Sequence, residues 1–249
     1  MNNTNLFNGR AEVYTQGRPS YPKELIDALY THYGVSHNSI IADIGSGTGK
    51  LSKQLLDKGS MVYAVEPNDD MRAIAENELS EYSKFISVSG NAENTLLLDH
   101  SVDFITVAQA FHWFDIKKFR LECDRIKKEN SKIILIWNSR DMTSDFNRES
   151  YEIYSKYCPR FKGFLGGMKV DDVRFSEFFN GRYEHITFDN PLMFTKDMFI
   201  SRSLSGSYSL QEGDECFDDY IASLEKLFDK YAVNEIVKMN NKTDAYIGR

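Results

Sequence analysis

Short apolar runs alternate with stretches of helical periodicity from residue 22 to residue 138. Each run is rich in Ile and Val and is bounded by Gly, Asn, Asp or Ser, as is typical of buried strands. This alternation predicts an α/β fold, a Rossmann-like, doubly wound and mostly parallel sheet with helices on both faces. The five predicted strands are residues 40–44, 61–66, 85–89, 102–108 and 132–138.

The pattern changes after residue 138. Residues 139–180 are rich in Tyr, Phe and Arg, and we expect a helical cap insertion there. A strand at 182–188 and a C-terminal antiparallel hairpin within 235–248 complete a predicted seven-stranded sheet. No segment has the composition of a linker, so we predict one domain. Its predicted parts are an N-terminal segment (1–21), a core (22–138), the cap (139–180) and C-terminal strands and helices (181–249).

The first predicted strand ends in a glycine-rich turn. Residues 40–49 read Ile-Ile-Ala-Asp-Ile-Gly-Ser-Gly-Thr-Gly, and an apolar helical pattern follows them. Glycines permit backbone angles that other residues avoid, and they leave bare main chain against which a ligand can lie. The helix that begins at the turn directs unpaired N–H groups toward that ligand. The sequence therefore predicts a ligand site at this turn.

The glycine spacing separates three classes of ligand. A phosphate-binding P-loop requires glycine where Ile44 stands and a hydroxyl residue where Leu51 stands, so this class is excluded. A dinucleotide fingerprint requires a third glycine at the position of Lys50, and here the glycine comes one residue early. A dinucleotide is therefore disfavoured, and other nucleosides remain.

An acidic residue ends the second predicted strand. Glu66 follows the first glycine of the turn by about twenty residues, the separation at which α/β nucleotide sites place a carboxylate on the ribose hydroxyls. Its charge would repel a ribose 2′-phosphate. NAD would use the same carboxylate. Glu66 therefore indicates a ligand that contains a nucleoside, but it does not distinguish NAD from other nucleoside cofactors.

Several motifs together resemble one family. The D-x-G-x-G-x-G of residues 43–49 resembles motif I of the class I S-adenosylmethionine-dependent methyltransferases. Residues 90–93 are similar to the family's adenine-contacting segment. Residues 109–114, Gln-Ala-Phe-His-Trp-Phe, are similar to the A-x-H-W-F stretch of the methyltransferase type 11 group. The Y-x-x-x-R-P-x-Y-P of residues 14–22 resembles the opening of the trans-aconitate methyltransferase-like subgroup, where it tends to close over the cofactor as a lid.

The resemblance implies a cofactor, S-adenosylmethionine, with S-adenosylhomocysteine as product, held by residues 22–138. It implies that the Asn91 amide oxygen accepts from the adenine amine and that the Ala92 N–H meets a ring nitrogen. The implied cofactor-binding residues are Tyr14, Asp43, Gly45, Ser46, Gly47, Gly49, Glu66, Pro67, Asn91, Ala92, Glu93 and Gln109. The expected substrate-binding residues are Arg18, Tyr21, Trp113 and Arg140.

The implied reaction is direct in-line transfer of a methyl group to an oxygen or nitrogen atom. A phenol or amine acceptor needs a general base, for which His112 is the candidate because imidazole titrates near neutral pH. A carboxylate acceptor needs no base, and Arg18 or Arg140 would hold it. His112 as a hydrogen-bonded core residue is the alternative to a catalytic role.

Composition bounds the partners. A net charge of -7 and a pI near 5.3 argue against a general nucleic-acid binder and favour a small-molecule acceptor. We expect a cytoplasmic monomer or homodimer, because no membrane span or secretion signal is found. Three widely spaced cysteines fit neither a disulfide framework nor a metal site. The alternatives are an NAD-dependent oxidoreductase of Rossmann type and a non-catalytic protein that binds S-adenosylmethionine.

Overall fold

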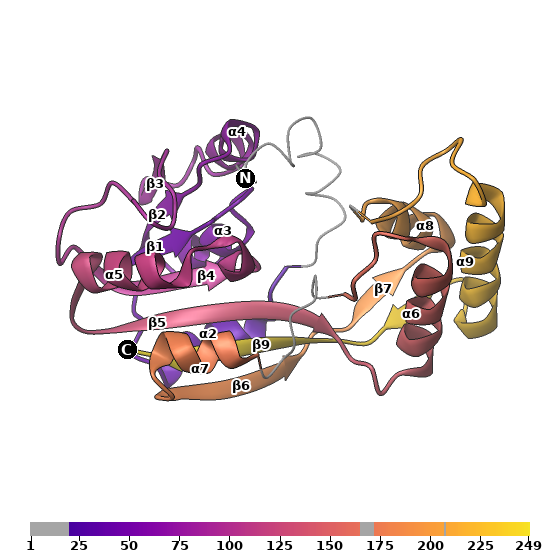
Figure 1. The fold of residues 1–249 in the computed structure, drawn as a ribbon. Helices are drawn as coiled ribbons and strands as arrows, with labels where there is room; N and C mark the ends of the chain where they lie inside the picture. The colour runs from indigo at the N-terminus through magenta and orange to yellow at the C-terminus, as the bar shows by residue number, and fades with distance from the viewer. Residues whose placement is uncertain (1–19, 165–171, 207) are drawn as a thin grey trace.

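The computed structural model describes residues 20–164, 172–206 and 208–249. Figure 1 shows two lobes, one built on a large sheet flanked by helices and the other a smaller, mainly helical lobe. The sequence predictions for Tyr14 and Arg18 fall outside the described residues, as does most of the predicted lid segment.

The large sheet has seven strands in the order β3-β2-β1-β4-β5-β9-β6. The first five strands are parallel, and β9 lies antiparallel between β5 and β6. This arrangement confirms the predicted fold class, and it brings the carboxyl ends of β1 and β4 together where the winding reverses. The strands are β1 (Ile40–Ile44), β2 (Met61–Val65), β3 (Phe85–Val88), β4 (Val102–Ala108), β5 (Lys127–Arg140), β6 (Tyr183–Asp189) and β9 (Asn241–Gly248).

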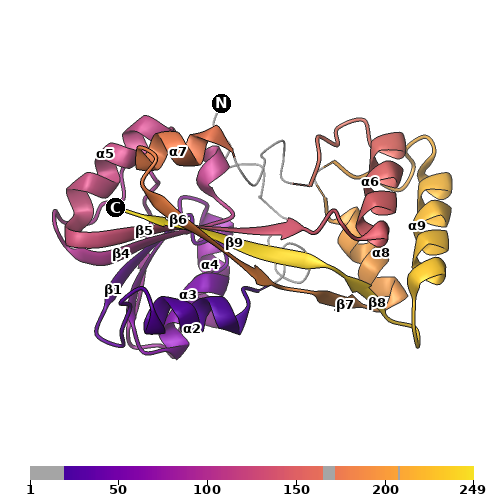
Figure 2. The ribbon, with the colours of Figure 1, turned by 90° about the horizontal axis from the view of Figure 1, so that it is seen from below.

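Helices cover both faces of this sheet, as Figure 2 shows. The helices α2 (Lys23–Thr31), α3 (Lys50–Asp57) and α4 (Asp69–Glu78) lie on one face, and α5 (Ile116–Ile126) and α7 (Val173–Phe179) lie on the other. Two apolar cores result, one on each side, because the central strands are buried on both faces.

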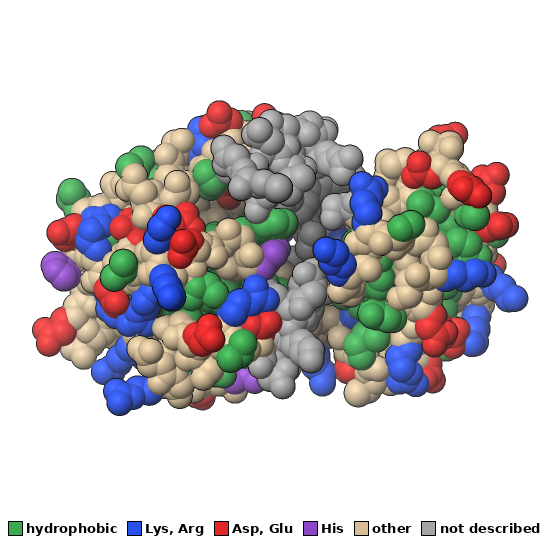
Figure 3. Space-filling model, in the orientation of Figure 1, with side chains coloured by type: hydrophobic (Ala, Val, Ile, Leu, Met, Phe, Trp, Pro, Cys, Tyr) green, Lys and Arg blue, Asp and Glu red, His purple; other side chains and the backbone are tan. Residues whose placement is uncertain are grey.

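The surface mixes both signs of charge. On the face drawn in Figure 3, acidic and basic side chains are interspersed over both lobes. Within the described part of the chain, no helix combines the length and the apolar composition that crossing a bilayer requires.

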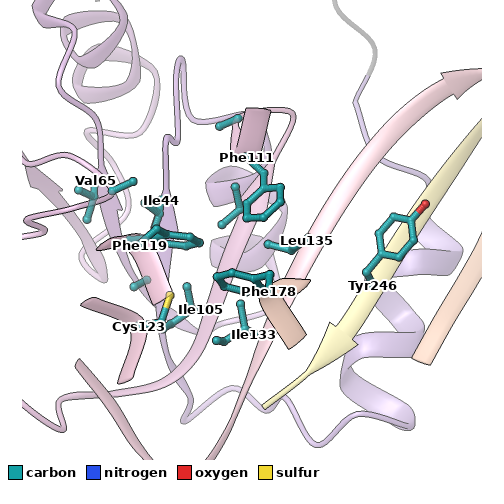
Figure 4. Close-up of a cluster of buried hydrophobic side chains, with 14 of the residues drawn as sticks. Ile44, Val65, Ile105, Phe111, Phe119, Cys123, Ile133, Leu135, Phe178 and Tyr246 are labelled. Carbon is teal, nitrogen blue, oxygen red and sulfur yellow. The ribbon is translucent and has the colours of Figure 1, made fainter. Parts of the chain in front are cut away.

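Aromatic rings fill the core between the sheet, α5 and α7. Phe178 stacks on Phe119 with ring centroids 5.4 Å apart and meets Phe111 edge-on at 5.2 Å. Figure 4 shows these rings beside Ile105 and Leu135 of the central strands. Such pairs add to the stabilisation that comes from burying their large apolar area.

The region predicted as one cap, residues 139–180, is divided between two places. Its first helix, α6 (Asp145–Tyr157), lies in the second lobe, whereas α7 returns to the sheet because its three Phe side chains are buried in the aromatic core. The second lobe also contains β7 (Leu192–Phe194), α8 (Lys196–Leu204), α9 (Phe217–Tyr231) and β8 (Val237–Met239).

The C-terminal strands are antiparallel, as predicted, but their partners differ from those of a simple hairpin. β8 pairs with β7, and β9 pairs with β5 and β6. The reason is burial, because Val237 and Met239 belong to the apolar core of the second lobe whereas Ala245 and Ile247 belong to that of the sheet. The chain leaves one lobe and enters the other at Asn240.

Strand β5 is longer than the predicted 132–138. It is paired with β9 as far as Arg140, which lies opposite Asn241. Figure 1 shows this pair of strands reaching toward the second lobe. The last residues of β5 are therefore placed between the two lobes.

A buried carboxylate ties the centre of the sheet together. Asp43 of β1 is 1% exposed and accepts hydrogen bonds from Ser52 Oγ of α3 at 2.7 Å and from Thr106 Oγ1 of β4 at 3.0 Å. Burial raises the pKa of Asp43 to about 6, against the effect of the two hydroxyl donors. This side chain joins β1, β4 and α3 directly beneath the glycine turn.

We expect Phe178→Ala to lower the free energy of unfolding by about 3–5 kcal/mol, because it leaves a cavity among the rings of the aromatic core. Urea titration measures the loss. The control is Val173→Ala on the same helix, since Val173 is 65% exposed. Equal effects of the two substitutions would show that α7 is not part of the core.

We expect Asp43→Asn to change how stability depends on pH. The pKa of Asp43, about 6 in the folded protein, lies above the value of about 3.9 for an unfolded chain. This carboxyl group therefore stabilises the fold below about pH 4, and its contribution is lost as the pH rises through 6. The unfolding free energy of the variant, relative to the wild type, should increase by about 2 kcal/mol from pH 4 to pH 7.

Urea titrations across this pH range measure that difference. The same substitution at the exposed Asp218 of α9 is the control for the loss of one carboxyl group. A constant difference for Asp43→Asn would show that the buried carboxyl group does not titrate as described.

Candidate cofactor and active site

The glycine turn adopts the geometry that its sequence predicts. Gly45, Gly47 and Gly49 have φ angles of 68°, 57° and 80°, in the left-handed region that favours glycine. A Cβ at Gly45 would lie 2.6 Å from the Cβ of Ala110, and one at Gly49 would lie 2.7 Å from Leu79 Cδ1. Among the described residues, none would lie within 4 Å of a Cβ at Gly47. Two glycines therefore allow close packing, and no described side chain or backbone covers the main chain at Gly47 on the side where a Cβ would stand.

Glu66 lies against this bare main chain. Its Oε2 accepts the N–H of Gly47 at 2.9 Å, and its Oε1 accepts the N–H of Asn68 at 2.9 Å. Burial raises the pKa of Glu66, while the two N–H donors and the nearby Arg72 oppose the shift. Each carboxylate oxygen keeps a free lone pair for a further donor such as a ribose hydroxyl. The structure thus joins the two predicted halves of a nucleoside site.

The other predicted residues of the turn have different surroundings. Asp43 contacts protein hydroxyls beneath the turn, which makes it a support for the turn. The Ser46 hydroxyl oxygen is buried and has no hydrogen-bond partner among the described residues. Pro67 is exposed beside Glu66.

The segment after β3 differs from its predicted use in one respect. The Asn91 side-chain oxygen accepts the N–H groups of Glu93 at 3.0 Å and Asn94 at 2.8 Å, so both of its lone pairs are engaged within its own turn. Ala92 is buried, and Glu93 Oε1 accepts the N–H of Asp115 at 2.8 Å, which ties this turn to the start of α5. An adenine amine would have to displace one of the Asn91 bonds.

A short helical turn, η2 (Phe111–Trp113), follows β4 beside the glycine turn. Gln109 precedes it with a φ of 58°, which is strained for a residue other than glycine, and its Nε2 donates to the Asn138 carbonyl at 3.1 Å. This bond links the ends of β4 and β5 and fixes where η2 begins.

The His112 ring lies half-buried between two indoles. Its centroid is 4.4 Å from that of Trp113 and 5.6 Å from that of Trp137, and Trp113 is 43% exposed. Aromatic faces of this kind suit a cationic ligand. Trp137 of β5 was not anticipated as a site residue, although its place near the carboxyl end of the predicted strand 132–138 could have indicated it.

Arg140 is held by aromatic rings of the second lobe. Its guanidinium carbon lies 4.0 Å from the centre of the Phe164 ring and 5.7 Å from that of Tyr154. Nη1 is buried and has no hydrogen-bond partner in the described part of the chain. Nothing in the sequence pointed to contacts between Arg140 and these two rings, apart from the many aromatic residues within 139–180.

Tyr21, predicted to bind substrate, is anchored on α3. Its backbone N–H donates to Gln54 Oε1 at 3.3 Å, and its carbonyl accepts from Gln54 Nε2 at 2.8 Å. Among residues 20–164, 172–206 and 208–249, no group of three His, Cys, Asp or Glu side chains is arranged to hold a metal ion.

Comparison with known proteins agrees with this geometry. Residues 42–135 match the family model described as a methyltransferase domain. An uncharacterized methyltransferase of Mycobacterium tuberculosis is 35% identical over 150 residues, which are 60% of this chain and 59% of that protein. An uncharacterized methyltransferase-like protein of Schizosaccharomyces pombe is 28% identical over 206 residues, 81% of this chain and 78% of its own. The chain thus spans less than two thirds of the mycobacterial relative.

Solved structures share the fold. A protein of Anaeromyxobacter dehalogenans, provisionally named a type II methyltransferase, superposes with a TM-score of 0.64 at 19% identity, over 93% of this chain and 97% of its own. A protein of Anabaena variabilis, provisionally named a methyltransferase of an antibiotic pathway, gives a TM-score of 0.61 at 21% identity, over 92% and 98%. Residues 42–135 thus match a methyltransferase domain, and the chain shares the fold of these solved proteins.

Proposed function

We propose that the protein transfers the methyl group of S-adenosylmethionine to an oxygen or nitrogen atom of a small molecule by direct in-line displacement. The observation that carries the proposal is the bond between the Glu66 carboxylate and the N–H of Gly47 at the open side of the glycine turn. A cytoplasmic location and a monomeric or homodimeric state belong to the same proposal.

The residues of the turn fit this cofactor. Glu66 would accept the ribose hydroxyls, and the bare main chain at Gly47 would let the methionine part approach closely. The buried Ser46 hydroxyl, which lacks a described partner, would gain one. When bound, the cofactor supplies an electrophilic methyl group on a cationic sulfur. Trp113 would present an aromatic face to that charge.

The contribution of the protein is mainly alignment. In-line attack requires the acceptor atom behind the methyl carbon, and holding two reactants in this geometry removes much of the entropic barrier. The hydrogen bond from Gln109 Nε2 to the Asn138 carbonyl joins the ends of β4 and β5, where the acceptor would lie. Trp113, which is 43% exposed, would line the acceptor space, whereas the Tyr21 ring is buried with the side chains of α2 and α3.

Two kinds of acceptor fit different residues. A carboxylate needs no base, and Arg140 offers a guanidinium that has no carboxylate partner among the described residues. Basic side chains also lie along the margin of the second lobe that faces the sheet, on the face drawn in Figure 3. A phenol or amine would need a proton acceptor, and His112, whose ring is near those of Trp113 and Trp137, is the candidate.

We expect Glu66→Gln to weaken the binding of S-adenosylhomocysteine by about tenfold to a hundredfold, because hydrogen bonds from hydroxyls to a charged acceptor contribute about 1.5–3 kcal/mol. Calorimetry with the full chain measures this loss. The matched control is Glu78→Gln at the exposed end of α4. Tight binding of NADH without binding of S-adenosylhomocysteine would refute the proposed cofactor.

A second experiment separates the two acceptors. The protein is incubated with a metabolite extract and methyl-labelled cofactor, and the product is identified by mass. With a carboxylate product, Arg140→Lys should raise KM at least about tenfold while kcat changes little, because a bidentate grip is lost. With a phenol or amine product, His112→Gln should instead remove the pH dependence of kcat. If no labelled small molecule forms, the protein binds the cofactor without turnover.

A further inference from the structure

The chain segment that follows β3 runs alongside α5, from the start of this helix to its end. Glu93 Oε1 accepts the N–H of Asp115, the N-cap of α5, at 2.8 Å. At the other end of the helix, the N–H of His100 donates to the carbonyl of Arg125 at 2.9 Å. The helix itself is fixed against the sheet by side chains buried in the aromatic core. Residues 93–100 therefore take their position from α5.

Glu122 of α5 holds the middle of this segment. It is 7% exposed, and its Oε1 accepts both the N–H of Thr95 at 2.7 Å and the Thr95 hydroxyl at 2.5 Å. Arg125 binds the two carboxylate oxygens of Glu122 through Nε at 2.9 Å and Nη2 at 2.7 Å, and its Nη1 donates to the Leu97 carbonyl at 2.8 Å. Burial acts to raise the pKa of Glu122, but the hydrogen bonds from Arg125 and Thr95 outweigh burial and lower it. Glu122 is therefore an ionised acceptor.

Thr95 in turn fixes the tight turn that follows β3. A Cβ at Gly90 would lie 2.7 Å from the carbonyl oxygen of Thr95, so the close contact between the two depends on glycine. The N–H of Asn91 donates to the carbonyl of Asn94 at 3.0 Å, and the N–H of Asn94 donates back at 3.3 Å. The position of Thr95 therefore sets that of the turn, and with it that of Ala92.

Ala92 has a backbone donor that the described residues leave unused. It is 4% exposed and belongs to the same apolar core as Phe119 of α5, yet no described atom accepts its N–H. Because buried N–H groups almost always have a partner, an acceptor atom of a ligand is expected there. The ring nitrogen next to the amine-bearing carbon of adenine is such an acceptor, whereas the same nitrogen of hypoxanthine carries a hydrogen.

We propose that Glu122 is a positioning residue that, through Thr95, holds the Ala92 N–H where it distinguishes adenine from other purine bases. The inference rests on the proposed cofactor. Glu122 and Thr95 do not touch the base in this arrangement, and they act by fixing the one donor that does.

Two probes that differ only in the base test this role. S-adenosylhomocysteine and S-inosylhomocysteine are titrated separately into the full chain and followed by calorimetry. The wild type should bind the adenine compound at least about tenfold more tightly, because a hydrogen bond is replaced by two opposed donors. A general loosening of the fold would weaken both compounds alike and leave the ratio of their affinities unchanged.

Thr95→Val keeps the shape of the side chain and removes the hydroxyl that donates to Glu122. We expect it to lower the ratio of affinities at least about threefold, and Thr95→Ser, which keeps the hydroxyl, should restore the ratio. Glu122→Gln should lower the ratio as well, since an amide nitrogen cannot accept from Arg125. If Glu122→Gln does not fold, the two substitutions of Thr95 decide the outcome.

Thr187→Val is the matched control. Thr187 Oγ1 donates to Asp244 Oδ1 at 2.8 Å on the edge strand β6, so the same substitution removes the same kind of bond far along the sheet. It should change the ratio less than about twofold. In the protein without ligand, the amide NMR signals of Ala92 and Glu93 should shift in Thr95→Val and stay in place in Thr187→Val.

The outcomes separate this inference from the proposed methyl transfer. An unchanged ratio in Thr95→Val, with S-adenosylhomocysteine still bound by the wild type, overturns the role of Glu122 and leaves the proposed function standing. Equal changes in Thr95→Val and Thr187→Val overturn it too, because the ratio would then follow stability. A wild type that binds neither compound contradicts the proposed cofactor, and this inference with it.

Discussion

A carboxylate at the end of β2 holds the glycine turn at the end of β1, and the arrangement of the site depends on this contact. Parallel pairing of β1 with β2 puts Glu66 within reach of the Gly47 N–H. Beneath it, Asp43 joins β1 to α3 and β4. One acid thus shapes the open side of the turn while the other fixes the elements that carry it. Both side chains are largely buried, at 1% exposure for Asp43 and 9% for Glu66.

The sequence alone predicted the parts of the fold in which the local hydrophobic pattern matches the burial of the residues in the structure. Residues 102–108 form a strand with the predicted bounds, and Glu66 lies where strand order and spacing predicted it. Three glycines at alternate positions have the left-handed angles that the turn requires. These features depend on residues that are close in the sequence, or on the rule that parallel sheets bind ligands at the carboxyl ends of their strands. Both can be read from a single sequence.

Other features depend on partners that are remote in the sequence. Phe175 and Phe178 lie in a segment whose richness in aromatic residues predicted a cap. They belong to the aromatic core instead, because α7 packs against α5. The pairing of β8 with β7 follows from a second apolar core that no local pattern announces. At the site, Asn91 has the expected residue type, but its oxygen is already bound within its own turn. The residue type shows which hydrogen bonds a side chain can form. The surrounding structure determines whether its donor and acceptor atoms are free to bind a ligand.

The pairing of β5 with β9 has a further consequence for the evolution of such a protein. The hydrogen-bonded ladder runs without interruption from Ile133 to Arg140, so it acts as a ruler that holds the second lobe at a set distance from the cofactor turn. The match to the family model ends at residue 135, before this ruler leaves the sheet. A change in the length of this ladder would therefore shift the second lobe relative to the turn by about 3.4 Å for each residue added or removed.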